Sequence, residues 1–320
     1  MSEVIDLIPG DWWIHEDPPK VKSDMFSEEL PGLQLVWDAT SFKQFQFCPR
    51  SYQYAIISGF RPRNESKHLT FGRHFHTALE AFDGAMALGV HWEDARRLAL
   101  DVALKVTKGW ESRDKDKNRF TLIRSVDWYC QHYGPDNPVK ILLLPSGKPA
   151  IEVSFRIMTL MLASTGEDFA LAGHIDALVS FIGNYYAMER KTTGKAINTT
   201  WFGTFDPDIQ IELYNWAGGT LLEQNLSGVL LDGTQVLVNS NSFGRHIIMK
   251  TRAQVNETFQ DIASILLSAD RYAQEEYWPK YTRNCWACPY SAVCSNQPSI
   301  RDQQLREDFH FDRWNPTIPR

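Results

Sequence analysis

Apolar residues recur at helical spacing between residues 40 and 133, after an irregular arm at 1–38. They fall every three or four positions, which is the spacing of one buried helix face. Thr40 or Ser41 is the expected N-cap of the first helix, and we expect the charged turn at 111–117 to be exposed. The predicted helices begin near Phe42 and Thr70 and cover 91–110 and 118–133.

After residue 138 the pattern changes to short apolar and β-branched runs broken by Gly, Pro and Asn, which indicates strands. Gly183-Asn184 between two such runs predicts a tight hairpin. Helical spacing returns at 207–224 and 252–277. The predicted strands are 139–144, 151–157, 171–182, 185–192, 234–239 and 245–251.

Composition is that of an ordinary globular protein. Of 320 residues, 43% are hydrophobic and 22% are charged, enough for a substantial core. No run of eighteen apolar residues occurs, and the N-terminus lacks the features of a signal peptide, so we expect a cytoplasmic, reducing location without membrane contact. The net charge of −6 argues against nonspecific coating of nucleic acid but allows a localised basic groove.

The main chemical pattern is an acidic one. If the strands on either side of Gly183-Asn184 pair, Asp176 lies beside Glu189. Lys191 shares the face of Glu189, while Arg190 points the opposite way. Two carboxylates and an ammonium group suit Mg²⁺ and a positioned water. An ion pair at the surface explains the same residues equally well.

Further site candidates lie on predicted helices. His76 is an imidazole that could join the same metal, with His74 and His174 as competitors. Gln210 and Tyr214 are four residues apart and share a helix face. Taken singly, each is better explained as an ordinary core, surface or amphipathic-helix residue.

Cysteines suggest a second inorganic centre. Cys285, Cys288 and Cys294 lie within ten residues, and Cys48 is the best fourth ligand. Four thiolates suit zinc or an iron–sulfur cluster alike. Cys130, on a predicted helix, is expected to be a core thiol.

The order of these pieces resembles the RecB-type branch of the PD-(D/E)XK nuclease superfamily. The resemblance covers roughly residues 40–296 and is greatest to members with an iron–sulfur cluster, such as the AddB nuclease domain, the CRISPR-adaptation exonucleases and their viral relatives. Thr40 stands where that family usually has Ser. The matching motifs are Thr40-x-Phe42-x2-Phe45-x2-Cys48-Pro49-x2-Tyr52, Gly72-x3-His76, the strand with Glu152, Gly173-x2-Asp176, Glu189-x-Lys191, Gln210-x3-Tyr214 and Cys285-x2-Cys288-x5-Cys294.

The resemblance implies an α/β fold with a restriction-endonuclease-like core, in which helices flank a central mixed sheet. The N-terminal half would be helical, and an iron–sulfur clasp would join the two ends of the domain. The implied boundaries are an irregular arm at 1–38, a nuclease domain at 39–296 and a tail at 297–320. The domain would include a helical insert at 91–133 and the cysteine segment at 285–294.

The resemblance also implies roles for individual residues. Asp176 and Glu189 would hold Mg²⁺ or Mn²⁺, with His76 and the main-chain carbonyl of Arg190 as further ligands. Lys191 would position the attacking water. Gln210 and Tyr214 would contact DNA or brace the site. For Cys48, Cys285, Cys288 and Cys294, it favours a 4Fe–4S cluster over zinc.

The implied activity is metal-dependent exonuclease cleavage of DNA ends or single strands. The setting would be recombination, repair, or CRISPR-type or viral DNA processing, in a bacterium or virus and with possible protein partners in a recombination or adaptation complex. The alternatives are a structure-dependent endonuclease and a DNA-binding subunit with little or no catalysis. Basic and aromatic residues flank the cysteines and suit single-stranded DNA, although packing explains them as well. They include Arg50, Tyr52, Lys280, Tyr281, Arg283 and Trp286.

Overall fold

The computed structural model describes residues 25–63, 66–134 and 136–318. The chain divides into two compact units, each built from segments that are discontinuous in sequence. Among the described residues, the first unit takes 25–63, 154–173 and 251–318, and the second takes 66–134, 136–153 and 174–250. The first 24 residues of the predicted arm lie outside the described residues.

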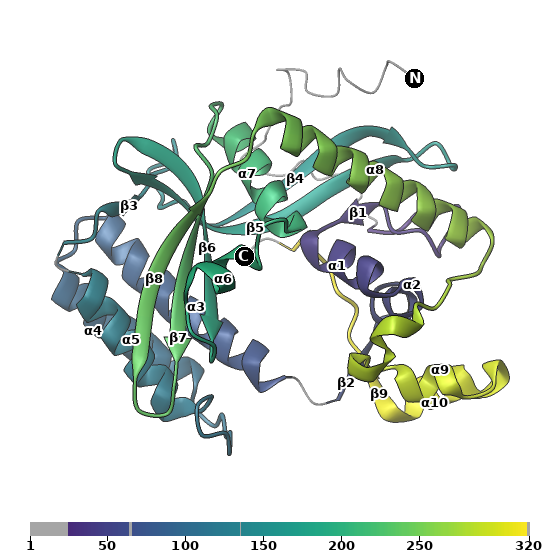
Figure 1. The fold of residues 1–320 in the computed structure, drawn as a ribbon, viewed down its shortest axis with the longest axis horizontal. Helices are drawn as coiled ribbons and strands as arrows, with labels where there is room; N and C mark the ends of the chain where they lie inside the picture. The colour runs from purple at the N-terminus through teal and green to yellow at the C-terminus, as the bar shows by residue number, and fades with distance from the viewer. Residues whose placement is uncertain (1–24, 64–65, 135, 319–320) are drawn as a thin grey trace. The chain divides into compact units, whose positions relative to one another are not determined.

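A mixed sheet forms the centre of the second unit (Figure 1). Its strands follow the order β5-β6-β7-β8, and β3 pairs with β5. β6 and β7 are parallel, and the other pairs are antiparallel. The hairpin predicted at Gly183-Asn184 is present, with Gly183 at φ +76°. The strands are β3 (Val139–Ile141), β4 (Ile151–Leu162), β5 (Asp168–Phe181), β6 (Asn184–Thr193), β7 (Val229–Val236) and β8 (Asn241–Ile248).

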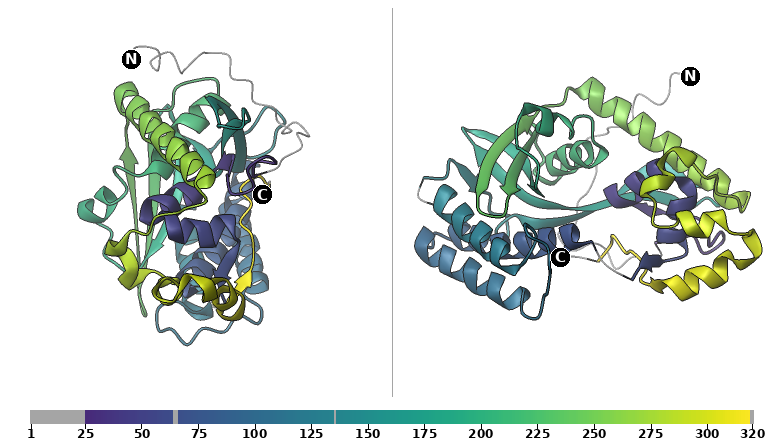
Figure 2. Two further views of the ribbon diagram at one scale, coloured as in Figure 1. Left: turned by 90° about the vertical axis from the view of Figure 1, so that its right-hand side faces the viewer. Right: turned by 60° about the horizontal axis from the view of Figure 1, so that its bottom comes forward.

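Helices cover both faces of this sheet. α3 (Lys67–Ala87), α4 (Trp92–Val106) and α5 (Arg119–Tyr133) lie side by side (Figures 1 and 2) and share one hydrophobic core, which includes Cys130 as expected. The other face carries α6 (Thr199–Gly203) and α7 (Ile209–Leu221). The fold is therefore the mixed α/β arrangement that the sequence predicts.

The first unit is organised around aromatic side chains. Its helices include α1 (Ala39–Phe47), α2 (Pro49–Tyr52), a π-helix at Gln53–Ile57 and α8 (Arg252–Gln274), and β1 (Val36–Trp37) runs parallel to the start of β5. The central cluster comprises Trp37, Phe42, Phe45, Tyr52 and Trp278.

The C-terminal segment is folded, which corrects the prediction of a polar tail from residue 297. A 3₁₀-helix at Thr282–Ala287, α9 (Ser291–Ser295) and a second 3₁₀-helix at Pro298–Ile300 lead to α10 (Arg301–Asp308). β9 (Phe309–Phe311) then pairs antiparallel with β2 (Phe60–Pro62). Apolar side chains from both ends of the chain close this core, namely Tyr54, Phe60, Tyr290, Val293, Leu305 and Phe309.

Three further local predictions are corrected. Asp38 caps α1, because its carboxylate accepts hydrogen bonds from the Ser41 amide and hydroxyl at 2.9 and 2.6 Å. β7 and β8 begin about five residues earlier than predicted, since β7 is a continuous buried run without alternation. Lys117, in the turn expected to be exposed, is only 1% exposed.

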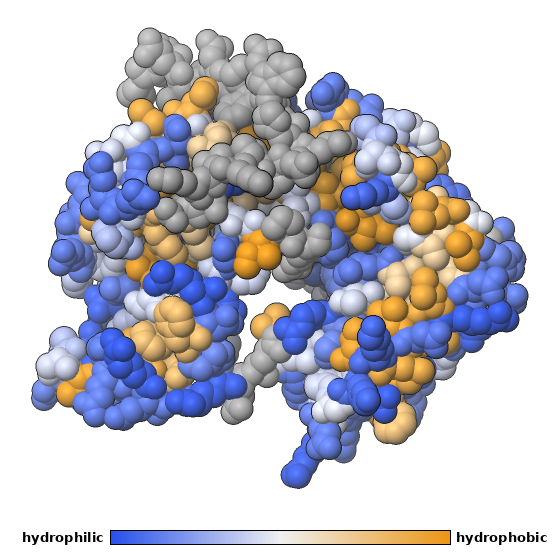
Figure 3. Space-filling view, turned by 180° about the vertical axis from the view of Figure 1, so that it is seen from behind, coloured by the Kyte–Doolittle hydropathy of each residue, from blue (hydrophilic) through white to orange (hydrophobic). Residues whose placement is uncertain are grey.

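No helix in the described part of the chain is long and apolar enough to cross a membrane. On the face shown in Figure 3, hydrophobic patches are interspersed with hydrophilic ones.

Candidate active site

The β5–β6 hairpin places Asp176 next to Glu189. In the β5–β6 ladder, Ala177 pairs with Met188, and Asp176 and Glu189 are the next residues along the two strands. The Arg190 amide donates a hydrogen bond of 2.7 Å to Asp176 Oδ2. Side chains on paired strands share a face when they are opposite each other. The two carboxylates therefore meet, as their spacing around the turn predicts.

α3 adds an imidazole and β4 adds a third carboxylate. His76 Nδ1 lies 3.5 Å from Asp176 Oδ2. One ligand atom from each of His76, Glu152 and Asp176 lies within 4.8 Å of the others, and no other group of three His, Cys, Asp or Glu side chains among the described residues meets that limit. His74 and His174, the competing histidines, do not belong to this group.

Glu152 is the residue that sequence reasoning undervalued. Its position on a strand was recognised through the family resemblance, yet no ligand role was assigned to it. Its φ of +47° is in the left-handed region, which residues with a side chain rarely occupy and which occurs at turns and at functional sites. The strand pattern gave no signal of this conformation.

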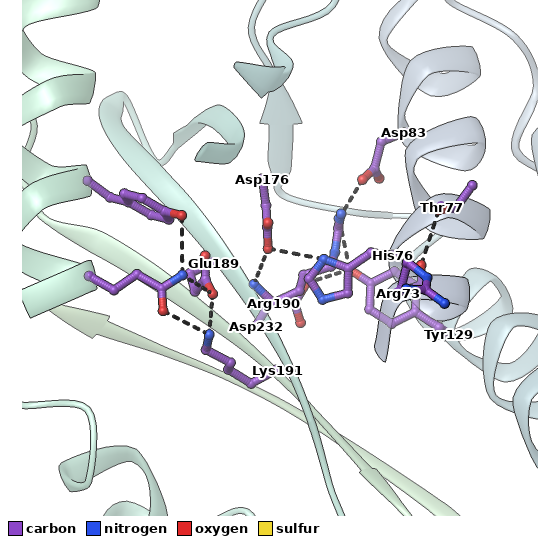
Figure 4. A network of polar contacts seen from close by, with 12 residues as sticks. Arg73, His76, Thr77, Asp83, Tyr129, Asp176, Glu189, Arg190, Lys191 and Asp232 are labelled. Atoms are coloured by element: carbon purple, nitrogen blue, oxygen red, sulfur yellow. Dashed lines mark hydrogen bonds and ion pairs between the residues drawn. The ribbon is translucent and has the colours of Figure 1, made fainter. Parts of the chain in front are cut away.

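Lys191 contacts both Glu189 and the helix α7 (Figure 4). Its Nζ pairs with Glu189 Oε1 and donates to Gln210 Oε1 at 3.2 Å. Gln210 Nε2 donates to Glu189 Oε1 at 3.0 Å and to the Tyr214 hydroxyl at 3.2 Å. Gln210 and Tyr214 thus meet the acidic motif in one chain of hydrogen bonds.

Burial and mutual charge govern the protonation of the site. Burial would raise the pKa of Asp176, but the charge and hydrogen bond of His76 lower it to about 2. Burial and the charge of Asp176 raise the pKa of Glu189. Burial would lower the pKa of His76, and Asp176 raises it instead. The two carboxylates therefore repel each other, and a divalent cation bound between them would relieve that repulsion.

The donor set fits a divalent metal ion. Glu189 Oε2 is buried without a hydrogen-bond partner in the described structure, and an unpaired buried acceptor of this kind is costly. Carboxylate oxygens are the ligands of Mg²⁺ and Mn²⁺, and imidazole is compatible with the softer of the two. Asp176, Glu152 and His76 could hold the ion, with Glu189 as a further ligand.

Comparison with known families decides the class. Residues 37–295 match the model of the PD-(D/E)XK nuclease superfamily. The chain belongs to this superfamily. Its members are nucleases that use divalent metals. Because they are nucleases, the family implies DNA as the substrate of this chain.

One solved structure supports the same fold. A candidate exonuclease from Eubacterium rectale is 12% identical with a TM-score of 0.50, and the match covers 90% of this nuclease and 98% of that chain. The protein SSO0001 is 12% identical with a TM-score of 0.31, over 72% of this chain and 95% of the other. No curated protein sequence matches the chain.

Cys48, Cys285, Cys288 and Cys294 lie in the first unit, but they do not form a ready-made site for one ion. The Tyr281 amide donates to Cys48 Sγ at 3.3 Å. Burial raises the pKa of Cys288 and of Cys294, and the Cys48 thiol contributes to both shifts. Their sulfurs do not all lie within 4.8 Å of one another in the described chain, so the structure by itself does not support a bound cluster.

The residues predicted to contact DNA near the cysteines divide into two kinds. Tyr52 is fully buried and donates to Gln34 Oε1 at 2.7 Å, which fits the packing alternative rather than contact with DNA. Arg50 is partly buried, donates to the Trp278 carbonyl at 2.6 Å and lies over the Tyr277 ring. Trp286, by contrast, is 89% exposed.

Proposed function

We propose that this nuclease is a Mg²⁺- or Mn²⁺-dependent DNA exonuclease that hydrolyses phosphodiester bonds at ends or in single strands. The observation that carries the proposal is the meeting of Asp176, Glu189 and Lys191 with the imidazole of His76. A bound metal would neutralise the scissile phosphate and lower the pKa of a coordinated water. The motif order that resembles RecB-type exonucleases supports action at ends, in recombination, repair or CRISPR-type or viral DNA processing.

Lys191 acts in this proposal as a cation. Burial would lower its pKa, but Glu189 and Asp176 raise it above its usual value. The ammonium therefore keeps its proton at neutral pH and donates hydrogen bonds. It orients the attacking water and stabilises negative charge that develops on the phosphate.

Gln210 holds both Lys191 and Glu189 by hydrogen bonds. Its amide oxygen accepts from Lys191, and its amide nitrogen donates to Glu189. Since both contacts come from one side chain, Gln210 fixes the distance between the cation and the carboxylate. Tyr214 restrains the amide from the next turn of α7.

Linear and circular DNA distinguish the alternatives. The protein is incubated with end-labelled linear DNA and with circular single- and double-stranded DNA, with Mg²⁺ or Mn²⁺. We expect digestion of linear DNA only, and Lys191→Ala should slow it by roughly 10²- to 10⁴-fold. Cleavage of circles would indicate an endonuclease, and binding without cleavage under either metal would indicate a DNA-binding subunit.

We also propose that Cys48, Cys285, Cys288 and Cys294 hold a 4Fe–4S cluster. Their spacing, the burial of Cys48 and the contribution of the Cys48 thiol to the raised pKa of Cys288 and Cys294 support it. A cluster of several atoms spans sulfurs that are further apart than the ligands of one zinc ion. Protein purified without oxygen should be brown and absorb visible light, with the absorption lost in Cys294→Ser. A colourless protein with stoichiometric zinc would overturn this assignment.

A further inference from the structure

Arg190 stands between Glu189 and Lys191 in sequence but lies on the other face of β6. Side chains alternate along a strand, so Arg190 points toward α3 and α5. Its side chain is only 4% exposed. A buried guanidinium is costly unless its charge is compensated, and its partners therefore define what it does.

Those partners come from three separate elements. Arg190 Nη2 lies 2.5 Å from Asp83 Oδ2 on α3 and donates to the Tyr129 hydroxyl on α5 at 3.4 Å. Arg190 Nε lies 3.7 Å from Asp232 Oδ2 on β7. One side chain thus connects two helices and a neighbouring strand, as Figure 4 shows.

A second arginine balances the charge. Arg245 on β8 lies 3.4 Å from Asp232 Oδ2 and donates to the Tyr129 hydroxyl at 3.3 Å and to Asn137 Oδ1 at 2.8 Å. Its guanidinium lies 3.7 Å from the centre of the Tyr133 ring. Two cations and two carboxylates make the network neutral, so it can remain buried.

A cavity of about 140 Å³ adjoins the network, and its lining includes Asp83, Arg190 and Arg245. This is room for several water molecules, each of which occupies about 30 Å³ in the liquid. Asp83 and Arg190 therefore border this cavity, which leaves some room for substituted side chains.

The network connects directly to the candidate metal ligands. The main-chain N–H of Arg190 donates to Asp176 Oδ2 at 2.7 Å, and His76 Nδ1 lies 3.5 Å from the same oxygen. His76 and Asp83 are about two turns apart on α3 and share a face. Arg190 therefore contacts α3 through its side chain and Asp176 through its backbone.

We infer that Arg190 is a positioning residue for the metal site, and that its buried pair with Asp83 fixes α3 against β6. This pairing sets where His76 stands relative to Asp176. The inference rests on the proposed metal-dependent reaction. Supporting residues of this kind typically change metal affinity or activity by 10- to 100-fold when they are removed.

Stability alone is the competing explanation, and the two roles can be separated. Replacing a whole buried ion pair by hydrophobic residues of similar size is often neutral or stabilising, whereas removing one partner leaves an uncompensated charge. The double variant Asp83→Leu/Arg190→Met should therefore keep the melting temperature near that of wild type. A purely structural pair would then leave metal binding unchanged.

The readouts are Mn²⁺ affinity by electron paramagnetic resonance, melting temperature, and kcat and KM on linear DNA. For the double variant we expect Mn²⁺ binding weaker by about 10- to 100-fold and a lower kcat, with KM for DNA unchanged. Arg190→Lys keeps the charge but reaches fewer partners, so it should be intermediate. Wild-type Mn²⁺ affinity and kcat in a folded double variant would overturn the inference.

Asp127→Asn is the matched control, because it breaks the 2.6 Å pair with Arg96 between α5 and α4 without touching β6. It should leave Mn²⁺ affinity unchanged. If the double variant does not fold, Arg190→Lys decides, and Mn²⁺ binding as in wild type would again overturn the inference.

A different set of results would refute the proposed nuclease function while leaving the inference about Arg190 testable. The wild type would bind Mn²⁺, lose it in Asp176→Ala, and still cut no DNA, while the Mn²⁺ affinity of the double variant would continue to test Arg190. A wild type without Mn²⁺ binding would overturn both proposals.

Discussion

Lys117 shows how far burial can override the chemistry of a single side chain. It is 1% exposed, its Nζ has no hydrogen-bond partner in the described structure, and the ammonium lies 4.1 Å from the centre of the Phe71 ring. Burial lowers its pKa from 10.5 to about 8. The interaction with the ring offsets only part of the cost of removing the charge from water.

Lys117→Met should therefore stabilise the protein by roughly 1–3 kcal/mol at neutral pH. Because the folded-state pKa lies below the unfolded one, the wild type carries its full penalty below about pH 8 and loses it as the pH approaches about 10.4. Its stability should rise across that window. Chemical denaturation from pH 7 to 10.5 checks this, and an identical pH dependence in the variant would contradict it.

Trp286 is an exposed aromatic side chain that suits stacking on a nucleobase. It is 89% exposed beside the cysteines, and each stacked base contributes roughly 1–3 kcal/mol. Trp286→Ala should weaken binding of single-stranded DNA by about 5- to 150-fold, measured by fluorescence anisotropy with a catalytically inactive Lys191→Ala background. Trp128→Ala, on α5, is the control. Equal affinity with and without Trp286 would argue against stacking.

Among the secondary-structure elements, the position of α6 depends on close approach to a glycine. A Cβ built on Gly233 would lie 2.7 Å from the Trp201 ring, and Gly233 is paired with Lys191 across the β6–β7 ladder. Only a glycine lets the helix pack this close to the strand. The short α6 was absent from the predicted elements because five residues carry no helical periodicity of their own.

Gly233→Ala should destabilise the protein by about 1–3 kcal/mol, the usual cost of overpacking a core. It should also lower kcat, because Trp201 would be pushed away from the strand next to Lys191. Trp201→Leu in the same background should restore part of the melting temperature. No recovery would show that the loss comes from the backbone of β7 rather than from the ring.

At the scale of elements, the sequence predicts type better than boundaries. α5 was expected at 118–133 and runs from Arg119 to Tyr133, because its periodicity is local. β7 was placed too late, since a strand buried on both faces has no alternation to mark its start. β9 was missed entirely, because three residues become a strand only by pairing with β2.

Across the whole molecule, the two proposed inorganic sites are held by different units. Cys48, Cys285, Cys288 and Cys294 belong to the first unit, whereas His76, Glu152, Asp176 and Glu189 belong to the second. The hydrophobic core next to Cys288 and Cys294 contains residues from near both ends of the chain. β2 and β9, which also come from the two ends, pair with each other. Loss of one site should therefore leave the other chemically intact.

Cys48→Ser tests this separation. We expect loss of visible absorption and a lower melting temperature, because the first unit would lose its link between α1 and the C-terminal segment. Mn²⁺ affinity, measured on the same sample, should remain within about threefold of wild type. This is less than the tenfold change in Kd that about 1.4 kcal/mol of binding free energy would produce. Loss of Mn²⁺ binding at a temperature where the variant is folded would show that the sites depend on each other.

The sequence by itself determined the local half of the candidate site. The strand period puts Glu189 and Lys191 on one face and Arg190 on the other, and the Gly183 turn brings Asp176 alongside. Only the tertiary structure decided that His76 is the nearby histidine and that Glu152 joins it. It also decided that Lys117 is buried and that Arg190 connects α3 to β6. These outcomes depend on packing between residues far apart in sequence, which no local pattern encodes.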